Sequence, residues 1–168
     1  VINTGPDADH VGGNDVLSKA GNQFFPGTRS ATSRPDALRS VAAILAQEGV
    51  ARHMTEAASS AGRPLVGAPT ESFHYPKKFL YLNDEAIEVL HQPAAHTDSD
   101  AFVYFEKANV LHTGDLFMSI GYPFVDGGNG GTLAGLIAAH EKALALCNDK
   151  TRVIPGHGPL SDRATLQA

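Results

Sequence analysis

The sequence predicts a layered α/β domain, and three observations favour this class. Segments typical of strands fill the middle of the chain, from about residue 71 to residue 112. Segments with apolar residues at helical spacing flank this region on both sides. The length of 168 residues suits one domain with its own hydrophobic core. Because mixed strands and helices pack in layers around a core, we expect a single domain over residues 1–168.

The first elements are short. Residues 1–3 are typical of the end of a buried strand, and a polar loop with several glycines follows over residues 4–13. Asn14 has a side chain suited to an N-cap, which predicts a helix over 15–20 that ends at Gly21. A chain that opens in a buried strand, without Met or a signal peptide, is expected to lack the first strands of its domain.

The segment 26–61 is expected to be an insertion that forms a helical flap. It opens with the turn-rich residues 26–35. Apolar residues at helical spacing then predict a helix that starts at Pro35 and includes Leu45, with an interruption at Gly49 and a resumed helix to the end of the segment. Such a flap could form a pocket wall or decorate the surface.

The remaining elements alternate strands with glycine-rich turns and end in helices. A loop over 62–70 precedes candidate strands at 71–75, 79–82, 86–91, 101–106 and 109–112. After a glycine-rich loop at 121–131, an amphipathic helix is expected from Leu133 to Cys147, and then a strand at 151–154 and a short helix near Ser161. The single cysteine, Cys147, follows the apolar pattern of this helix and is expected to be a buried small hydrophobe.

Composition and charge limit the class of partner. The formal net charge is -5, and Lys and Arg form no cluster or stripe, so we expect no nucleic-acid partner. No apolar run approaches the roughly 18–20 residues that cross a bilayer, so we expect no membrane partner. A small-molecule substrate is the partner that remains. The cytoplasm and the periplasm both stay open as locations, and the oligomeric state stays unknown.

Four short segments place an Asp or a His just beyond a predicted strand. They are Asp7-Ala8-Asp9-His10, Ala95-His96-Thr97-Asp98, His112-Thr113-Gly114-Asp115 and Pro155-Gly156-His157-Gly158. Functional side chains favour loops that a rigid sheet holds in place. Imidazole nitrogen and carboxylate oxygen are the ligands that a hydrolytic divalent metal needs. The pattern therefore indicates a metal site built from loops that are distant in sequence.

These motifs, in this order, resemble those of the metallo-β-lactamase superfamily. That family carries an H-x-H-x-D-H loop after a buried strand, a lone His, an Asp in a strand-G-D element and a His in a P-G-H-G turn. Here the loop reads NTGPDADH over residues 3–10, the lone His is His96, the Gly-Asp pair ends at Asp115, and the last His is His157. The resemblance implies an αββα sandwich with two metals at the edges of its sheets.

The resemblance also implies which residues hold each metal. The residues carried over are Asp9, His10 and His157 at the second metal, His96 at the first metal, and Asp115 as the bridge between the two metals. The two leading His positions of the family hold Gly5 and Asp7 in this chain. Gly5 offers no side-chain ligand, whereas the carboxylate of Asp7 can still bind zinc, iron or manganese.

Three outcomes follow from this departure. A single metal could occupy the second site, a dinuclear centre could form through Asp7, His96 and Asp115, or the chain could be a degenerate relative that binds a metal or small ligand without catalysis. We expect Zn²⁺, as one or two ions, with iron or manganese as alternatives. A metal there would lower the pKa of a bound water toward about 7, and Asp9 or Asp115 would orient that water or accept its proton.

The resemblance implies a hydrolase that acts on an ester, thioester, lactone or amide. β-Lactam hydrolysis ranks lower, because the family's β-lactamases usually carry Cys or Ser where this chain has Asp115. Phe117, Met118, Tyr122 and Phe124 follow that Asp and could line a substrate pocket, with core packing as the equal alternative. We expect packing roles for His53, His74, His91 and His140, support of a ligand or packing for His112, and a solvated turn or support of a ligand for Asp98.

Overall fold

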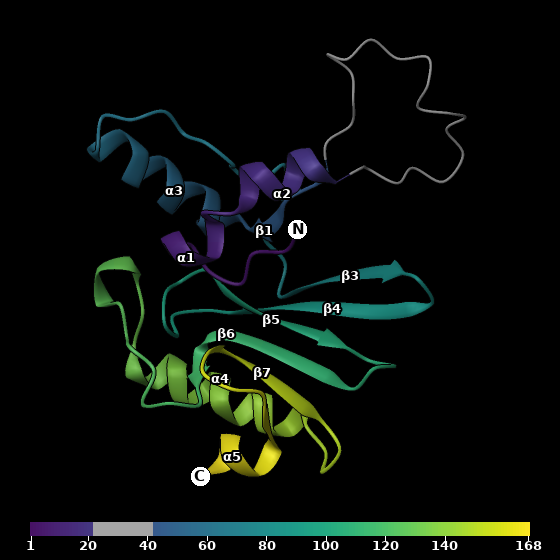
Figure 1. Cartoon of the computed structure of the whole chain (residues 1–168). Helices are drawn as coiled ribbons and strands as arrows, with labels where there is room; N and C mark the ends of the chain where they lie inside the picture. Colours follow the sequence, from purple (N-terminus) through teal and green to yellow (C-terminus); the bar gives the residue numbers. More distant parts are fainter. Residues whose placement is uncertain (22–41) are drawn as a thin grey trace.

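The computed structural model describes residues 1–21 and 42–168 and has four layers, as Figure 1 shows. The helices are α1 (Ala8–Val11), α2 (Asn14–Ala20), α3 (Glu48–Ser60), α4 (Leu133–Leu146) and α5 (Arg163–Gln167). The strands are β1 (Leu45–Gln47), β2 (Glu71–Phe73), β3 (Lys77–Leu82), β4 (Glu85–Gln92), β5 (Asp100–Phe105), β6 (Val110–Met118), β7 (Arg152–His157) and β8 (Ser161–Asp162). Strands β3 to β8 form one sheet in chain order, antiparallel except for the parallel pair β6–β7, and β1 and β2 form a small parallel sheet.

The two faces of the large sheet are buried against different layers. Val89 on β4 and Ala101 on β5 pack with residues of β1 and β2, so this face meets the small sheet. The next residues along the same strands, Leu90 and Phe102, point the other way and pack toward α4. This alternation is the period of two that a strand imposes on its side chains. Both faces are therefore apolar, and the sheet lies inside the molecule.

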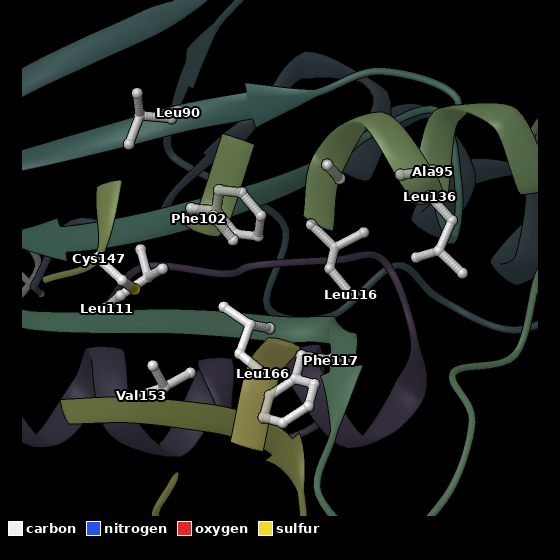
Figure 2. Packing of buried hydrophobic residues seen from close by; sticks show 12 residues of the cluster. Leu90, Ala95, Phe102, Leu111, Leu116, Phe117, Leu136, Cys147, Val153 and Leu166 are labelled. Atoms are coloured by element: carbon white, nitrogen blue, oxygen red, sulfur yellow. The ribbon is translucent and has the colours of Figure 1, made fainter. Parts of the chain in front are cut away.

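The outer helices complete the sandwich. Ala46 on β1 packs against Val50 and Met54 of α3, which covers the far side of the small sheet. On the opposite side, Leu136 and Cys147 belong to the cluster that α4 and α5 form with the large sheet (Figure 2). The order helix, sheet, sheet, helix confirms the αββα sandwich that the sequence predicts. The buried position of Cys147 in this core is also confirmed.

One expected helix is wrong in part. Residues 45–47 form strand β1, which pairs in parallel with β2, instead of continuing a helix from Pro35. All three residues are buried, between α3 on one side and the large sheet on the other. Burial on both faces favours a strand over the helical spacing of the local sequence. Gly49 lies inside the first turn of α3 and does not interrupt it.

Residues 22–41, which include the turn-rich part of the expected flap and its Pro35, lie outside the described residues. The loop over 62–70 and the helix that begins at Leu133 are confirmed. Strands β6 and β7 extend further than the sequence indicates, to Met118 and His157. In the two described ranges, none of the helices combines the length and apolar character needed to cross a bilayer.

Candidate metal centre

The residues of the four motifs come from separate elements that end at the same place. Asp7 occupies the N-cap position of α1, and Asp9 and His10 lie on this one-turn helix. His96 lies in the turn between β4 and β5. The expectation that Asp115 and His157 stand just beyond their strands is wrong. Asp115 lies within β6, and His157 is the last residue of β7.

One group of potential ligands consists of Asp9, His10, Asp115 and His157, whose ligand atoms all lie within 4.8 Å of one another. Oδ1 of Asp115 lies 3.1 Å from Nε2 of His10 and 3.4 Å from Nε2 of His157. Oδ2 of Asp9 lies 3.4 Å from Nε2 of His157. These four side chains therefore converge as the ligands of a single cation would.

A second group consists of Asp7, His96 and Asp115. Nε2 of His96 lies 3.1 Å from Oδ2 of Asp7 and 4.0 Å from Oδ2 of Asp115. Asp115 thus belongs to both groups. Its Oδ1 atom faces His10 of the first group, and its Oδ2 atom faces His96 of the second group. A carboxylate that faces two clusters in this way has the geometry of a bridge between two cations.

Hydrogen bonds orient two of the histidines, His96 and His10, so that Nε2 faces the centre. Nδ1 of His96 lies 2.8 Å from the backbone carbonyl of Phe124. Because a carbonyl only accepts, Nδ1 must donate, and in the neutral ring Nε2 keeps its lone pair. Nδ1 of His10 lies 2.9 Å from the hydroxyl of Thr4, which can donate or accept, and this contact turns Nε2 of His10 toward Asp115. Metal-binding histidines in proteins are oriented by partners of this kind.

Two glycines leave room at the centre, Gly156 for the carboxylate of Asp115 and Gly114 for the side chain of Thr4. A Cβ atom on Gly156 would fall well inside contact distance of Oδ1 of Asp115. Gly114 has φ of +56°, and the pairing of β6 with β7 shifts register there. Oδ1 itself is buried, and it lies beside Nε2 of His10 and Nε2 of His157, which give it no donor when these neutral rings hold their proton on Nδ1. A buried carboxylate oxygen without a donor is costly, and a bound cation would remove that cost, so the residues present fit a metal.

The charges of the cluster shift the pKa values of its members. The Asp7 carboxylate raises the pKa of His96 to about 9, against the opposing effect of burial. Asp115 raises the pKa of His10 in the same way. Burial acts to raise the pKa of Asp115, but the nearby imidazoles of His10, His157 and His96 outweigh it and hold the pKa below its usual value. The pair of Asp7 and His96 therefore carries mutually stabilised opposite charges at neutral pH.

The centre opens into a cavity of about 240 Å³, which Met118 and Phe124 line together with the ligand candidates. The side chain of Asp115 is 13% exposed, whereas those of Asp9 and His157 are 55% and 41% exposed. The bridge position therefore lies at the buried floor of the site, and Asp9 and His157 lie at its mouth.

The structure adds a brace for the turn that carries His96. Asp98 accepts a hydrogen bond from Arg52 and lies 2.8 Å, through Oδ1, from Nε2 of His53. Its backbone N–H donates to the carbonyl of Asn129. Sequence reasoning expects only packing from His53 and misses this pair, because the two residues lie 45 positions apart and on different elements.

The other histidines take no part in either group. His112 accepts a hydrogen bond at Nδ1 from the backbone N–H of Gly114, which agrees with support of the neighbouring Asp and not with ligation. The imidazole of His91 contacts the backbone carbonyl of Asp98 at 2.8 Å, and Nδ1 of His140 lies 3.1 Å from the carbonyl of Leu136.

An αββα sandwich with Asp and His gathered at the strand ends defines the metallo-β-lactamase class of fold. The sequence model of the metallo-beta-lactamase superfamily matches residues 1–157, and the chain belongs to this superfamily. No curated protein matches the sequence significantly.

Solved structures agree with this assignment. A metallo-beta-lactamase from Pontibacter korlensis is 17% identical with a TM-score of 0.68, over 99% of this chain and 64% of its own. The BLEG-1 B3 metallo-beta-lactamase is 24% identical with a TM-score of 0.68, over 98% of this chain and 71% of its own. TTHA1623 in a di-iron-bound form is 20% identical with a TM-score of 0.66, over 98% of this chain and 72% of its own. At these identities the likeness establishes the fold, and the present chain spans less than two thirds of the Pontibacter korlensis protein.

Proposed function

We propose that this chain is a divalent-metal-dependent hydrolase of esters, thioesters, lactones or amides. The observation that carries the proposal is the position of Asp115, whose two oxygens face two different sets of Asp and His side chains. Asp9, His10 and His157 would complete one metal site, and Asp7 and His96 would complete the other. When bound, a divalent metal supplies a Lewis acid and a water of lowered pKa.

Proton transfer is the step that the protein's own side chains perform. Asp9 is the most exposed carboxylate of the cluster and lies at the mouth, so it accepts a proton from the attacking water. For an ester, the water oxygen bonds to the carbonyl carbon, the bond from that carbon to the leaving oxygen breaks, and Asp9 passes the proton to the leaving oxygen. The products are a carboxylic acid and an alcohol, and no other reactant is needed.

Gly5 supports a second candidate function, a metal-binding relative without catalysis. Where the family places a ligand, this chain has no side chain, so the group around His96 has three protein ligands. A catalytic zinc typically has three protein ligands and a water, so three ligands are compatible with activity. Zinc is the first choice of metal for a set of His and Asp, and the di-iron form of TTHA1623 supports iron as the alternative.

Turnover of a chromogenic panel, with and without a chelator, tests the proposal. We expect the zinc-loaded chain to hydrolyse at least one ester, thioester, lactone or amide, to lose activity with chelator, and to regain it with zinc. Asp115→Asn should lower kcat/KM by about 100-fold or more. The matched control is Asp84→Asn, a change at an exposed carboxylate paired with Lys107. Bound zinc without turnover of any substrate would favour the binding-only relative.

A further inference from the structure

The cavity beside the metal-binding side chains has a wall without a charged group. Residues 116–125 run from Asp115 to Asp126, read LFMSIGYPFV and contain no Asp, Glu, Lys, Arg or His. Met118 and Phe124 of this segment line the cavity together with the ligand candidates. The space in which the scissile bond would lie is therefore polar on one side and apolar on the other.

Direct contacts hold this wall against the ligand candidates. Met118 pairs with His157 across strands β6 and β7. The ring of Phe124 stands edge-on to the ring of His96, with the ring centroids 6.0 Å apart. The backbone N–H of Ser119 donates to the carbonyl of His157 over 3.0 Å. A group bound next to the metals would therefore touch the apolar wall.

The wall remains open to solvent. Tyr122 is 98% exposed and Phe124 is 67% exposed, and Ile120 is also exposed. Ile120 lies against the turn that follows His157, because a Cβ atom on Gly158 would stand 2.9 Å from its Cγ2 atom. Exposed apolar side chains that continue a polar pocket are typical of a ligand-binding surface.

We propose that the substrate carries an uncharged apolar group of several carbons next to the scissile carbonyl, and that this group lies on Met118, Ile120 and Phe124. The inference rests on the proposed hydrolase function and names the substrate class. An anionic group in this place would find no partner for its charge, because the described residues that line the cavity include no Lys or Arg. Each methylene group removed from water should strengthen binding about fourfold.

Hydroxamic acids measure this preference without requiring turnover, because their head group chelates the metal while the tail probes the wall. Calorimetry with the zinc-loaded chain should show that butanohydroxamic acid, with two more methylene groups, binds about 15-fold more tightly than acetohydroxamic acid. Succinic monohydroxamic acid, which ends in a carboxylate, should bind at least about tenfold more weakly than the butano compound. The kcat/KM values of p-nitrophenyl butyrate, acetate and hemisuccinate should follow the same order.

Two variants and a matched control place the preference on the wall. Ile120→Ala should reduce the advantage of the four-carbon compound by about threefold to tenfold, with little change for the two-carbon compound. Phe124→Ala should lower the ratio of the two affinities by a similar factor, and this ratio is the readout for that variant because the Phe124 ring also touches His96. Phe124→Ala keeps the backbone carbonyl that orients His96. The control is Phe79→Ala on β3, a comparably exposed ring outside the cavity, which should leave the preference unchanged.

The outcomes separate the inference from the function on which it rests. A rising series of hydroxamate affinities without turnover of any ester, thioester, lactone or amide supports the apolar wall and contradicts hydrolysis. If affinity or kcat/KM is the same for the two-carbon and four-carbon compounds, or is higher for the succinate compounds, the inference is wrong. Turnover in that case still supports hydrolysis. A chain that binds no zinc contradicts both.

Discussion

At the scale of single residues, the centre depends on side chains that are small or absent as much as on the ligands. Oδ1 of Asp115 is buried because Gly156 has no Cβ atom to fill the same space. Thr4 and the carbonyl of Phe124 then decide which imidazole nitrogens face that oxygen and its partner. The geometry of the candidate ligands therefore depends also on residues outside the two groups.

Gly156→Ala tests this claim about space. The added methyl group would displace the carboxylate of Asp115, so we expect the variant to lose most bound zinc and about 1–3 kcal/mol of unfolding free energy. Elemental analysis and denaturant titration measure the two effects. Gly127→Ala is the control, since a Cβ atom there meets nothing within 4 Å. If both variants bind zinc equally, the carboxylate does not need the space that Gly156 leaves.

Gly5→His tests the missing ligand. A Cβ atom on Gly5 would lie 3.5 Å from Nδ1 of His10 and 3.9 Å from Oδ2 of Asp7, which are ordinary contacts, so the backbone accepts a side chain. A fourth ligand beside His96 should strengthen the weaker zinc site by about tenfold or more in a chelator competition assay. Gly5→Ala is the control, and an equal affinity for the two variants would show that position 5 does not face the metal.

At the scale of elements, the first turns of α3 support the turn that carries His96. Arg52 and His53 both bind the carboxylate of Asp98, and this residue is also tied through its backbone to Asn129. The brace joins α3, the turn after β4 and the turn before α4. The position of His96 therefore depends on an element on the other side of the sandwich.

Asp98→Asn should loosen that turn. The amide keeps the shape of the side chain but loses its charge, so the contacts with Arg52 and His53 weaken. We expect zinc affinity at the site of Asp7 and His96 to fall about tenfold, with the other site unchanged. Titration with two equivalents of zinc measures both sites, and Asp84→Asn serves again as the control. A loss spread evenly over both sites would indicate a general effect on folding instead.

The sequence predicts the elements that depend on local pattern, and most of the side chains that converge at the candidate centre. Strand alternation and turn residues locate β3 to β7, and the family motifs bring Asp9, His10, Asp115 and His157 together. The sequence does not predict β1, because residues 45–47 form a strand only when they are buried between α3 and the large sheet, and most of that sheet lies far along the chain. The brace between His53 and Asp98 is missed for the same reason, since no local pattern links the two residues.

At the scale of the whole molecule, the centre joins two halves of the sandwich. Asp7, Asp9 and His10 come from α1 and its N-cap. Asp115 and His157 come from strands of the large sheet, and His96 comes from the turn between two of its strands. A metal bound by both should hold them together. At a zinc concentration of about 100 times Kd, we expect a gain of about 2.7 kcal/mol and a rise in Tm of about 5–10 °C. An unchanged Tm would mean that zinc binds the unfolded chain equally well.

The pH dependence of zinc binding follows from the raised pKa values. Metal binds the neutral imidazole, and His96, with its pKa raised to about 9 by Asp7, holds a proton at neutral pH in the metal-free chain. Zinc affinity should therefore rise as pH increases from 6 to 9, and binding at pH 7 should release protons into the buffer. In the metal-free chain, protonated His96 beside Asp7 stabilises the fold. This contribution is fully present below about pH 6.5 and is lost as pH rises through about 9. Calorimetry in buffers of different ionisation enthalpy counts the protons, and an affinity independent of pH would contradict this reading.

Anomalous diffraction from zinc-loaded crystals tests the central claim most directly. We expect two peaks, one within bonding distance of Asp9, His10, Asp115 and His157 and the other within bonding distance of Asp7, His96 and Asp115. A zinc-loaded structure in which Asp115 binds no metal, or in which the metals lie away from these side chains, would contradict the account.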